Sequence, residues 1–310
     1  MIEKIGERQW IEKYKSCLQN ESLIRLIKYG SIPEIGSWAF LKLAFLWSCA
    51  STYTNIIGHR YPNIFYVDLF SGSGLYNFKD YSKNKQFLLG SSILMSTATF
   101  KYPFKKCFFF EKNRETANLL EKRLCTLKDN KKLTCNNYIL LDDSNKKIEE
   151  VISEISGING VHFLLFVDPY STEIHWNTMK KLLSLAYPSF DMIFNFQPFG
   201  INRKSYSPET LIDYFGDEEY NKYLRKQNVL DLLESYYIQK LKKYKMVKTT
   251  KIIKIESGKG GFYYDLIYTT RKDKPQWLPA IEHIKKMTEK FTGYEVSIIS
   301  DPLLPSLTKF

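Results

Sequence analysis

The chain has 310 residues, of which 44% are hydrophobic, and a formal net charge of +12. This is enough apolar material for one large domain with an appendage. The five cysteines form no Cys-x-x-Cys pair, which predicts reduced thiols in a cytoplasmic protein and excludes a typical zinc site or disulfide framework. No signal peptide is visible, and the longest apolar run, 38–50, is too short for a bilayer and contains Lys42. We therefore expect no metal and no membrane anchor.

The positive charge is concentrated near the C-terminal end. Residues 221–290 hold 17 Lys and Arg against 7 Asp and Glu. A basic region beside a nucleotide-type site favours a polyanionic substrate such as DNA or RNA. A solvated lysine-rich surface from an AT-biased genome explains the same composition, so the sequence leaves both interpretations open.

Residues 1–60 are expected to be mainly helical, because their apolar residues recur at spacings of three and four. Gly30, Pro33 and Gly36 separate two helices. These helices would cap a sheet, guard a substrate cleft or add to the core.

The segment 64–76, IFYVDLFSGSGLY, is the centre of the predicted fold. A short buried strand ends on Asp68, and a turn with Gly72 and Gly74 follows, where the backbone can turn sharply and approach a ligand closely. The pattern is typical of a nucleotide-binding α/β sheet, although a Gly-x-Gly turn also occurs in ordinary loops. Residues 77–90 are predicted to be irregular, and Gly90, Ser91 and Ser92 to cap a helix that begins at Ile93.

Two further strands are predicted, at 107–113 and 137–142, with a helix over 114–128 between them. Glu111 closes the first of them, where dinucleotide-type folds place an acid for the ribose hydroxyls. Glu111 lies further along the sequence from Gly74 than the acid does in those folds, so an insertion is expected between the two residues. Asp143 follows the other strand as the expected N-cap of the next helix and as a second candidate ligand contact.

A fourth strand, which begins at 161, runs into Asp168, Pro169 and Tyr170. Proline ends the strand and fixes the turn. This places a carboxylate and an aromatic ring beside the glycine loop, where they could hold a planar base by its amine. A fifth strand, 190–198, precedes Arg203 and Lys204, which are placed to meet a phosphate.

The remaining elements are an acidic helix start at 215–220, a helix over 228–243, a hairpin of strands 246–255 and 262–270, and a last helix from Trp277 to Met287. The expected organisation is a helical cap at 1–60, an α/β core at 61–275 and a helix with a tail at 276–310. The core would contain an insertion at about 75–103 and a basic lobe at about 221–275, with Lys242 and Lys243 as further phosphate contacts.

The whole series of predicted strands, with the acids that end them and the terminal hairpin, resembles the class I S-adenosylmethionine-dependent methyltransferase fold. That fold is an α/β, Rossmann-like, mostly parallel sheet with a C-terminal hairpin. More narrowly, the series resembles the three-Cys-motif partner (TcmP) proteins of bacteria and archaea, which are named for a neighbouring gene with a radical-enzyme-like triple-cysteine motif. The resemblance covers about residues 60–290 and lies in the runs YVDLFSGSG, LLGSS, FFFEKN, DDSN, FVDPYSTEIHW, FNF, FGDEEY and YYDLIYTTRK. The chain is also similar to ribosomal RNA adenine-N6 methyltransferases.

This resemblance implies a methyltransferase that acts on a base amine of nucleic acid. Gly72 and Gly74 would pass the methionine moiety of S-adenosylmethionine, Glu111 would hold the ribose and Asp143 the adenine amine. Asp168, Pro169 and Tyr170 would hold the acceptor. The complete cofactor set that it implies is Asp68, Phe70, Ser71, Gly72, Gly74, Glu111, Lys112 and Asp143.

Two alternatives stay open. Nucleic-acid amino-methyltransferases carry Asp-Pro-Pro-Tyr or a close variant, whereas one proline stands between Asp168 and Tyr170 here. The chain could therefore be a non-catalytic partner of a three-Cys-motif protein. A NAD-dependent oxidoreductase is disfavoured, because Asn77 stands where the third glycine of Gly-x-Gly-x-x-Gly would be.

Overall fold

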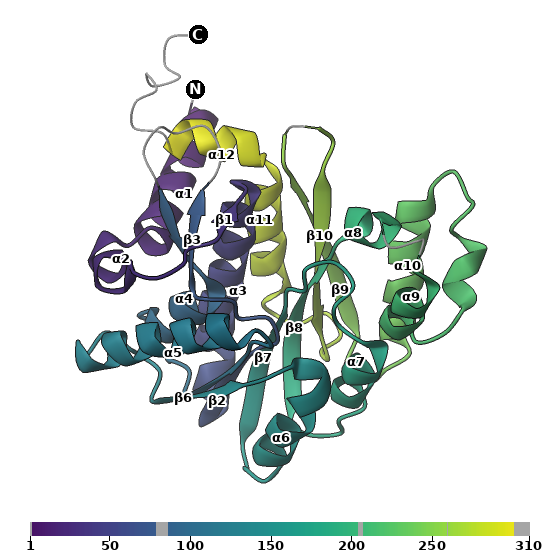
Figure 1. Ribbon diagram of the computed structural model, residues 1–310, viewed down its shortest axis with the longest axis horizontal. Coiled ribbons are helices and arrows are strands. Elements are labelled where there is room, and N and C mark those ends of the chain that lie inside the picture. The colour runs from purple at the N-terminus through teal and green to yellow at the C-terminus, as the bar shows by residue number, and fades with distance from the viewer. Residues whose placement is uncertain (1, 79–85, 204–206, 259, 301–310) are drawn as a thin grey trace.

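The computed structural model of the protein describes residues 2–78, 86–203, 207–258 and 260–300 (Figure 1). Its centre is a seven-stranded sheet of order β6-β5-β2-β7-β8-β10-β9. The five parallel strands are β2 (Asn63–Asp68), β5 (Lys106–Phe110), β6 (Asn137–Leu141), β7 (Val161–Val167) and β8 (Ser189–Phe196). The antiparallel hairpin of β9 (Thr249–Glu256) and β10 (Tyr263–Thr270) joins the sheet at β8. This is the predicted α/β fold of class I methyltransferases.

Helices cover both faces of the sheet, because the inner strands are apolar on both sides. One face packs against α3 (Trp38–Arg60), α4 (Ser91–Thr97), α5 (Arg114–Asp129) and α11 (Leu278–Glu289). The other face packs against α6 (Ser144–Ser156), α7 (Trp176–Leu183), α9 (Pro208–Phe215) and α10 (Val229–Lys242). The two cores follow the two-residue alternation along each strand: Tyr66 and Leu164 face α3, whereas Phe65 and Leu165 face the other layer.

The N-terminal helices pack on the C-terminal ones. Helix α1 (Ile2–Leu18) lies against α3 and α12 (Gly293–Ser300), at the top of Figure 1. Helix α2 (Glu21–Ile27) packs on α5. The short elements α8 (Pro198–Arg203) and η1 (Glu219–Lys222) connect β8 to α9 and α9 to α10.

The structure differs from the sequence-based expectation between 75 and 97. The stretch predicted as irregular, 77–90, contains the end of β3 (Leu75–Phe78) and all of β4 (Phe87–Leu89). These two strands form a small sheet with β1 (Glu34–Ile35). These strands are too short to show a period in the sequence. Helix α4 begins at Ser91 and not at Ile93, so Ser91 and Ser92 lie inside the helix and their hydroxyls bond to Asp68 and Ser71. Its N-cap residue, Gly90, has no side chain that could cap it.

Smaller differences have local causes. The fifth strand ends at Phe196 and not at residue 198, because Pro198 begins α8. The acidic segment 215–220 leads into a 3₁₀ turn at Glu219 instead of an α-helix. Helix α12 follows the predicted last helix. Lys204 and the tail from 301 lie outside the described residues.

A fully buried arginine joins the N-terminal helices to the glycine loop. The guanidinium of Arg123, on α5, donates to the carbonyls of Ile27 (3.1 Å), Tyr29 (2.7 Å), Ser31 (3.4 Å) and Ser73 (2.6 Å). Arginine suits this position because its planar fork carries five donors and keeps its charge. The clamp therefore fixes the loop after β2 to the chain that leaves α2.

Arg123→Met should lower the free energy of unfolding by about 2–4 kcal/mol, because several buried carbonyls would lose their donor. Urea denaturation measures this change. The matched control is Lys122→Met, on the exposed side of the same helix, which should stay within about 0.5 kcal/mol of the wild type. Equal effects of the two substitutions would show that the clamp does not contribute.

Candidate active site

Three acids lie at the carboxyl edge of three neighbouring parallel strands. Asp68 ends β2, Glu111 follows β5, and Asp168 follows β7, in the strand order β5-β2-β7. The chain passes from β2 outward to β5 and β6, then returns to the other side of β2 as β7. The crevice outside such a reversal is where open α/β sheets bind ligands. The structure thus brings the main sequence-predicted residues to one edge.

Asp68 lies beneath the glycine loop and is fully buried. Its carboxylate accepts hydrogen bonds from the Ser91 hydroxyl (2.6 Å), the Tyr66 hydroxyl (3.2 Å) and the Phe70 N–H (3.2 Å). Burial raises the pKa of Asp68 to about 7, while these hydrogen bonds counteract the rise. Asp68 therefore holds the loop from below instead of presenting its carboxylate to a ligand.

Ser71 is also internal. Its N–H donates to the Phe110 carbonyl (2.9 Å), and its hydroxyl donates to the Asp68 carbonyl (3.2 Å). Its neighbours Phe70 and Gly72 are half-buried and retain some exposure. Ser71 therefore orders the loop through backbone contacts to both β2 and β5.

The two loop glycines have left-handed backbones, with φ of +59° at Gly72 and +80° at Gly74. A Cβ at Gly72 would collide with the hydroxyl of Tyr76, and one at Gly74 would lie 2.6 Å from Ile93. Gly90 closes the loop, since its N–H donates to the Gly74 carbonyl (2.8 Å). The sharp turn that the sequence predicted thus requires glycine by conformation, and neighbouring protein side chains require it by space. Close approach to a ligand stays a prediction.

Glu111 faces this loop from the end of β5. Its half-buried carboxylate accepts hydrogen bonds from the backbone N–H groups of Asn113 (2.8 Å) and Gly72. Burial is the largest influence on its pKa, which is raised, and these hydrogen bonds oppose the rise. A carboxylate this close to the left-handed glycine is available to ligand hydroxyls.

The exposed Lys112 connects this side to the turn after β7, residues 168–173. Its ammonium lies 2.5 Å from Glu173, whose second oxygen accepts the Tyr170 N–H (3.0 Å). The hydrogen bond and charge of Glu173 raise the pKa of Lys112. Asp143 caps α6 as predicted, accepting the Asn145 N–H (2.9 Å).

Asp168 is held by two groups that the sequence analysis did not identify. The Asn195 amide donates to Oδ1 (2.6 Å), and the Lys42 ammonium lies 2.6 Å from Oδ2. The amide of Gln197 donates to the Pro169 carbonyl (2.8 Å). The signals were present: Lys42 is a lone charge in an apolar helix, and Asn195 a lone amide in a buried strand.

Aromatic rings surround this point. Tyr264 lies under the Lys42 ammonium, 5.6 Å from it, and donates its hydroxyl to the Trp38 carbonyl (3.1 Å). Phe262 packs on Trp38 and on Phe199 of α8. The side chain of Tyr170 is 76% exposed, which leaves its ring open for stacking on a ligand.

The predicted phosphate contacts are dispersed. Arg203 is the last residue of α8, after β8, and Lys204 lies outside the described residues. Lys242 and Lys243 are exposed at the far end of α10. That helix begins near the carboxyl edge of β8, where Asp231 and Glu234 lie near Asp265. Its 14 residues carry Lys242 about 20 Å away from this edge. The structure therefore does not bring these two lysines to Asp168.

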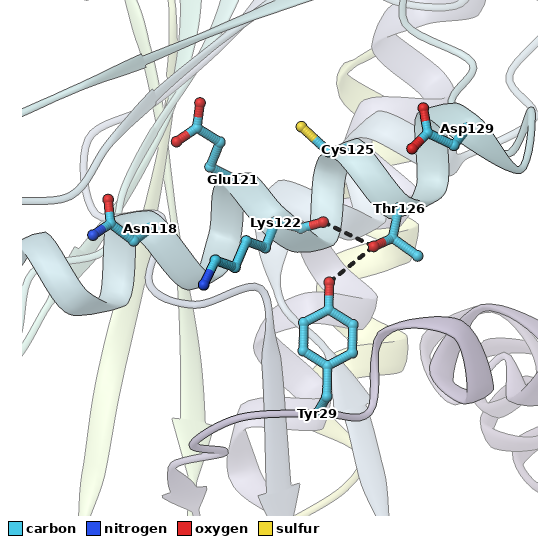
Figure 2. A pocket seen from close by; sticks show the side chains of 7 residues that line it. All are labelled: Tyr29, Asn118, Glu121, Lys122, Cys125, Thr126 and Asp129. Atoms are coloured by element: carbon cyan, nitrogen blue, oxygen red, sulfur yellow. Dashed lines mark hydrogen bonds between the residues drawn. The ribbon is translucent and has the colours of Figure 1, made fainter.

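A shallow surface hollow of about 550 Å³ lies elsewhere, between α5 and the segment after α2 (Figure 2). Tyr29 and Thr126 are joined across it by a hydrogen bond of 3.0 Å. It contains none of the predicted site residues, so the sheet edge remains the candidate site.

Within the described part of the chain, no group of three or more His, Cys, Asp or Glu could hold a metal ion. No described helix has the length and apolar character needed to cross a membrane.

Comparison with known proteins gives a limited picture. No protein-family model matches the sequence, and no curated protein matches it. A Legionella pneumophila protein of the DUF519 family is similar in structure, with a TM-score of 0.46 and 12% identity over 78% of this chain and 91% of that one. An rRNA methylase from Streptococcus thermophilus has a TM-score of 0.36 and 10% identity, over 70% of this chain and 93% of that one. A Klebsiella pneumoniae protein named as an O-methyltransferase candidate has a TM-score of 0.37 and 9% identity, over 81% of this chain and 95% of that one. These TM-scores and sequence identities are too low to assign a function, which depends on this chain's own residues.

The buried Asp68 gives a prediction for pH dependence. Its pKa of about 7 in the folded protein exceeds the unfolded value of about 3.9, so folding takes up a proton between these two values. The free energy of unfolding should therefore fall as pH rises through this window. In Asp68→Asn, the fall between pH 5 and pH 8 should be smaller by about 2 kcal/mol.

Urea denaturation at the two pH values measures this difference. Asp191, Glu234 and Asp265 also have raised pKa values, but they are present in both proteins and cancel in the comparison. Asp142→Asn, at an exposed carboxylate, is the control and should follow the wild type. The same slope in all three proteins would contradict the assignment.

Proposed function

We propose that the protein is an S-adenosylmethionine-dependent methyltransferase that acts on nucleic acid. The observation that carries this proposal is the position of Glu111, whose carboxylate accepts the N–H of the left-handed Gly72 at the strand reversal of a class I methyltransferase sheet. A ribose diol needs a carboxylate acceptor at this place, and a methionine chain needs a bare backbone beside it.

The residues present fit the cofactor. The loop keeps a bare backbone, because a Cβ at Gly72 would meet the Tyr76 hydroxyl and one at Gly74 would meet Ile93 and Leu120 of the core. Gly90 has the Gly74 backbone only 3.0 Å from where its Cβ would be. Asp143 lies beyond the next strand, where the adenine amine would be held. When bound, the cofactor supplies a methyl group on a sulfonium that is already a strong electrophile, so the protein contributes mainly positioning.

Support for a nucleic-acid acceptor comes from the acceptor side. The exposed Tyr170 ring can stack on a base, and the net charge of +12 favours a polyanion. The sequence points to a base amine held by Asp168 and the Pro169 carbonyl. A partner role beside a three-Cys-motif protein is the second candidate, and the single proline between Asp168 and Tyr170 favours it.

Cofactor binding is the primary test. Calorimetric titration with S-adenosylhomocysteine should give micromolar affinity, and Glu111→Ala should weaken it by about 1–3 kcal/mol, because ligand hydroxyls lose their acceptor. Glu115→Ala, on the exposed first turn of α5, is the control and should bind like the wild type. No heat and no thermal shift with the wild-type protein would refute the proposal.

Nucleic-acid binding should be steeply salt-dependent. Each phosphate neutralised by the protein adds about 0.7–0.9 to the slope of log affinity against log salt concentration. Charge reversal of the exposed Lys242, Lys243 and Lys245 should flatten this slope if they contact the backbone. Fluorescence anisotropy with duplex DNA and single-stranded RNA measures it. Binding that does not respond to salt, or no binding at low salt, would leave these lysines as a solvated surface.

A further inference from the structure

Lys42 is the only charged residue in the buried first half of α3, residues 38–50. Its neighbours Leu41 and Leu43 are buried, and its own side chain is 16% exposed. Its ammonium lies 2.6 Å from Asp168, whose side chain is 18% exposed. An ion pair at this depth costs desolvation energy, yet it remains open to the sheet edge. Such a pair is expected at a site of reaction rather than in a core.

The hydrogen bonds of the Asp168–Pro169 turn are largely used within the protein. The Pro169 carbonyl accepts from the Gln197 amide (2.8 Å) and the Ser171 N–H (3.1 Å), which occupies both of its lone pairs. Each Asp168 oxygen already has one donor, Asn195 on one and Lys42 on the other. An exocyclic base amine carries two N–H groups and needs two acceptors to orient it. The turn offers it the carboxylate alone.

A hydroxyl group has different requirements. It needs one acceptor for its proton and a cation near the oxygen, where negative charge gathers as the proton leaves. Asp168 and Lys42 supply these two groups within one ion pair.

Resting on the proposed function, we propose that Lys42 and Asp168 form a dyad that selects a hydroxyl acceptor, which in nucleic acid is the ribose 2′-hydroxyl of RNA. The hydroxyl oxygen forms the new bond to the methyl carbon. The carbon–sulfur bond of the cofactor breaks with its electron pair going to sulfur, and the hydroxyl proton passes to Asp168. Lys42 stabilises the charge on the oxygen during the transfer. DNA lacks this hydroxyl and is not a substrate.

The first experiment identifies the methylated atom. Total RNA and total DNA are incubated with the full chain and tritiated S-adenosylmethionine, digested to nucleosides and separated. The label is expected in 2′-O-methyl nucleosides from RNA and to be absent from DNA. Label in N-methylated bases would overturn the dyad's selectivity while upholding a methyltransferase. No label on either substrate, with S-adenosylhomocysteine still bound, would overturn the dyad's catalytic role. Absence of cofactor binding would instead overturn the proposed function.

The second experiment tests the lysine itself. Lys42→Met should lower kcat at least 100-fold, while the affinity for S-adenosylhomocysteine changes less than twofold, which also shows that the variant is folded. Lys42→Arg restores the cation and should recover part of the rate. Lys105→Met removes an exposed lysine before β5 and should leave both quantities unchanged. If Lys42→Met retains the wild-type kcat, or Lys42→Arg is no better than Lys42→Met, Lys42 has no role in the transfer.

Discussion

The buried carboxylate of Asp68 is the constraint on which the glycine loop depends. A carboxylate in this position must collect donors, and it takes them from Tyr66 on its own strand, Phe70 in the loop and Ser91 on α4. It thereby fixes the loop at one end, while Arg123 fixes Ser73 near the other. The left-handed Gly72 lies between these anchors, and the left-handed Gly74 directly follows Ser73 and accepts the Gly90 N–H. The loop backbone that a ligand would contact is therefore fixed by Asp68 and Arg123, which the ligand would not contact.

The helical cap is part of the site rather than a cover over it. Helix α3 carries Lys42 to Asp168 and Trp38 to the hydroxyl of Tyr264. Segment 27–31 supplies three of the four carbonyls that satisfy Arg123. If the N-terminal helices were removed, a buried guanidinium and the Asp168 carboxylate would both lose partners. The cap and the sheet therefore share buried polar contacts, which explains why they pack as one body.

The sequence predicted the parallel part of the sheet well, because β2, β5, β6, β7 and β8 are mainly apolar and lead into an acid or, after β8, into Pro198. Asp68, Glu111 and Asp168 were identified by that position alone, and the structure brings them to one edge. The partners of these acids could not be predicted, since Lys42, Ser91 and Asn195 lie 126, 23 and 27 residues from the acids that they hold. The strands β3 and β4 were missed because short strands lack a measurable period. The residues around Ser91 do not indicate whether its hydroxyl caps the helix or donates to Asp68.

Two ion pairs lie at the carboxyl edge of the sheet. Lys42 reaches Asp168 from α3, and Lys112 reaches Glu173 from the end of β5. Glu173 also accepts the Tyr170 N–H, and its charge raises the pKa of Glu111 nearby. Glu173 therefore joins the Lys112 ammonium, next to Glu111 in the chain, to the backbone of Tyr170, so that one carboxylate connects the chain after β5 with the turn after β7.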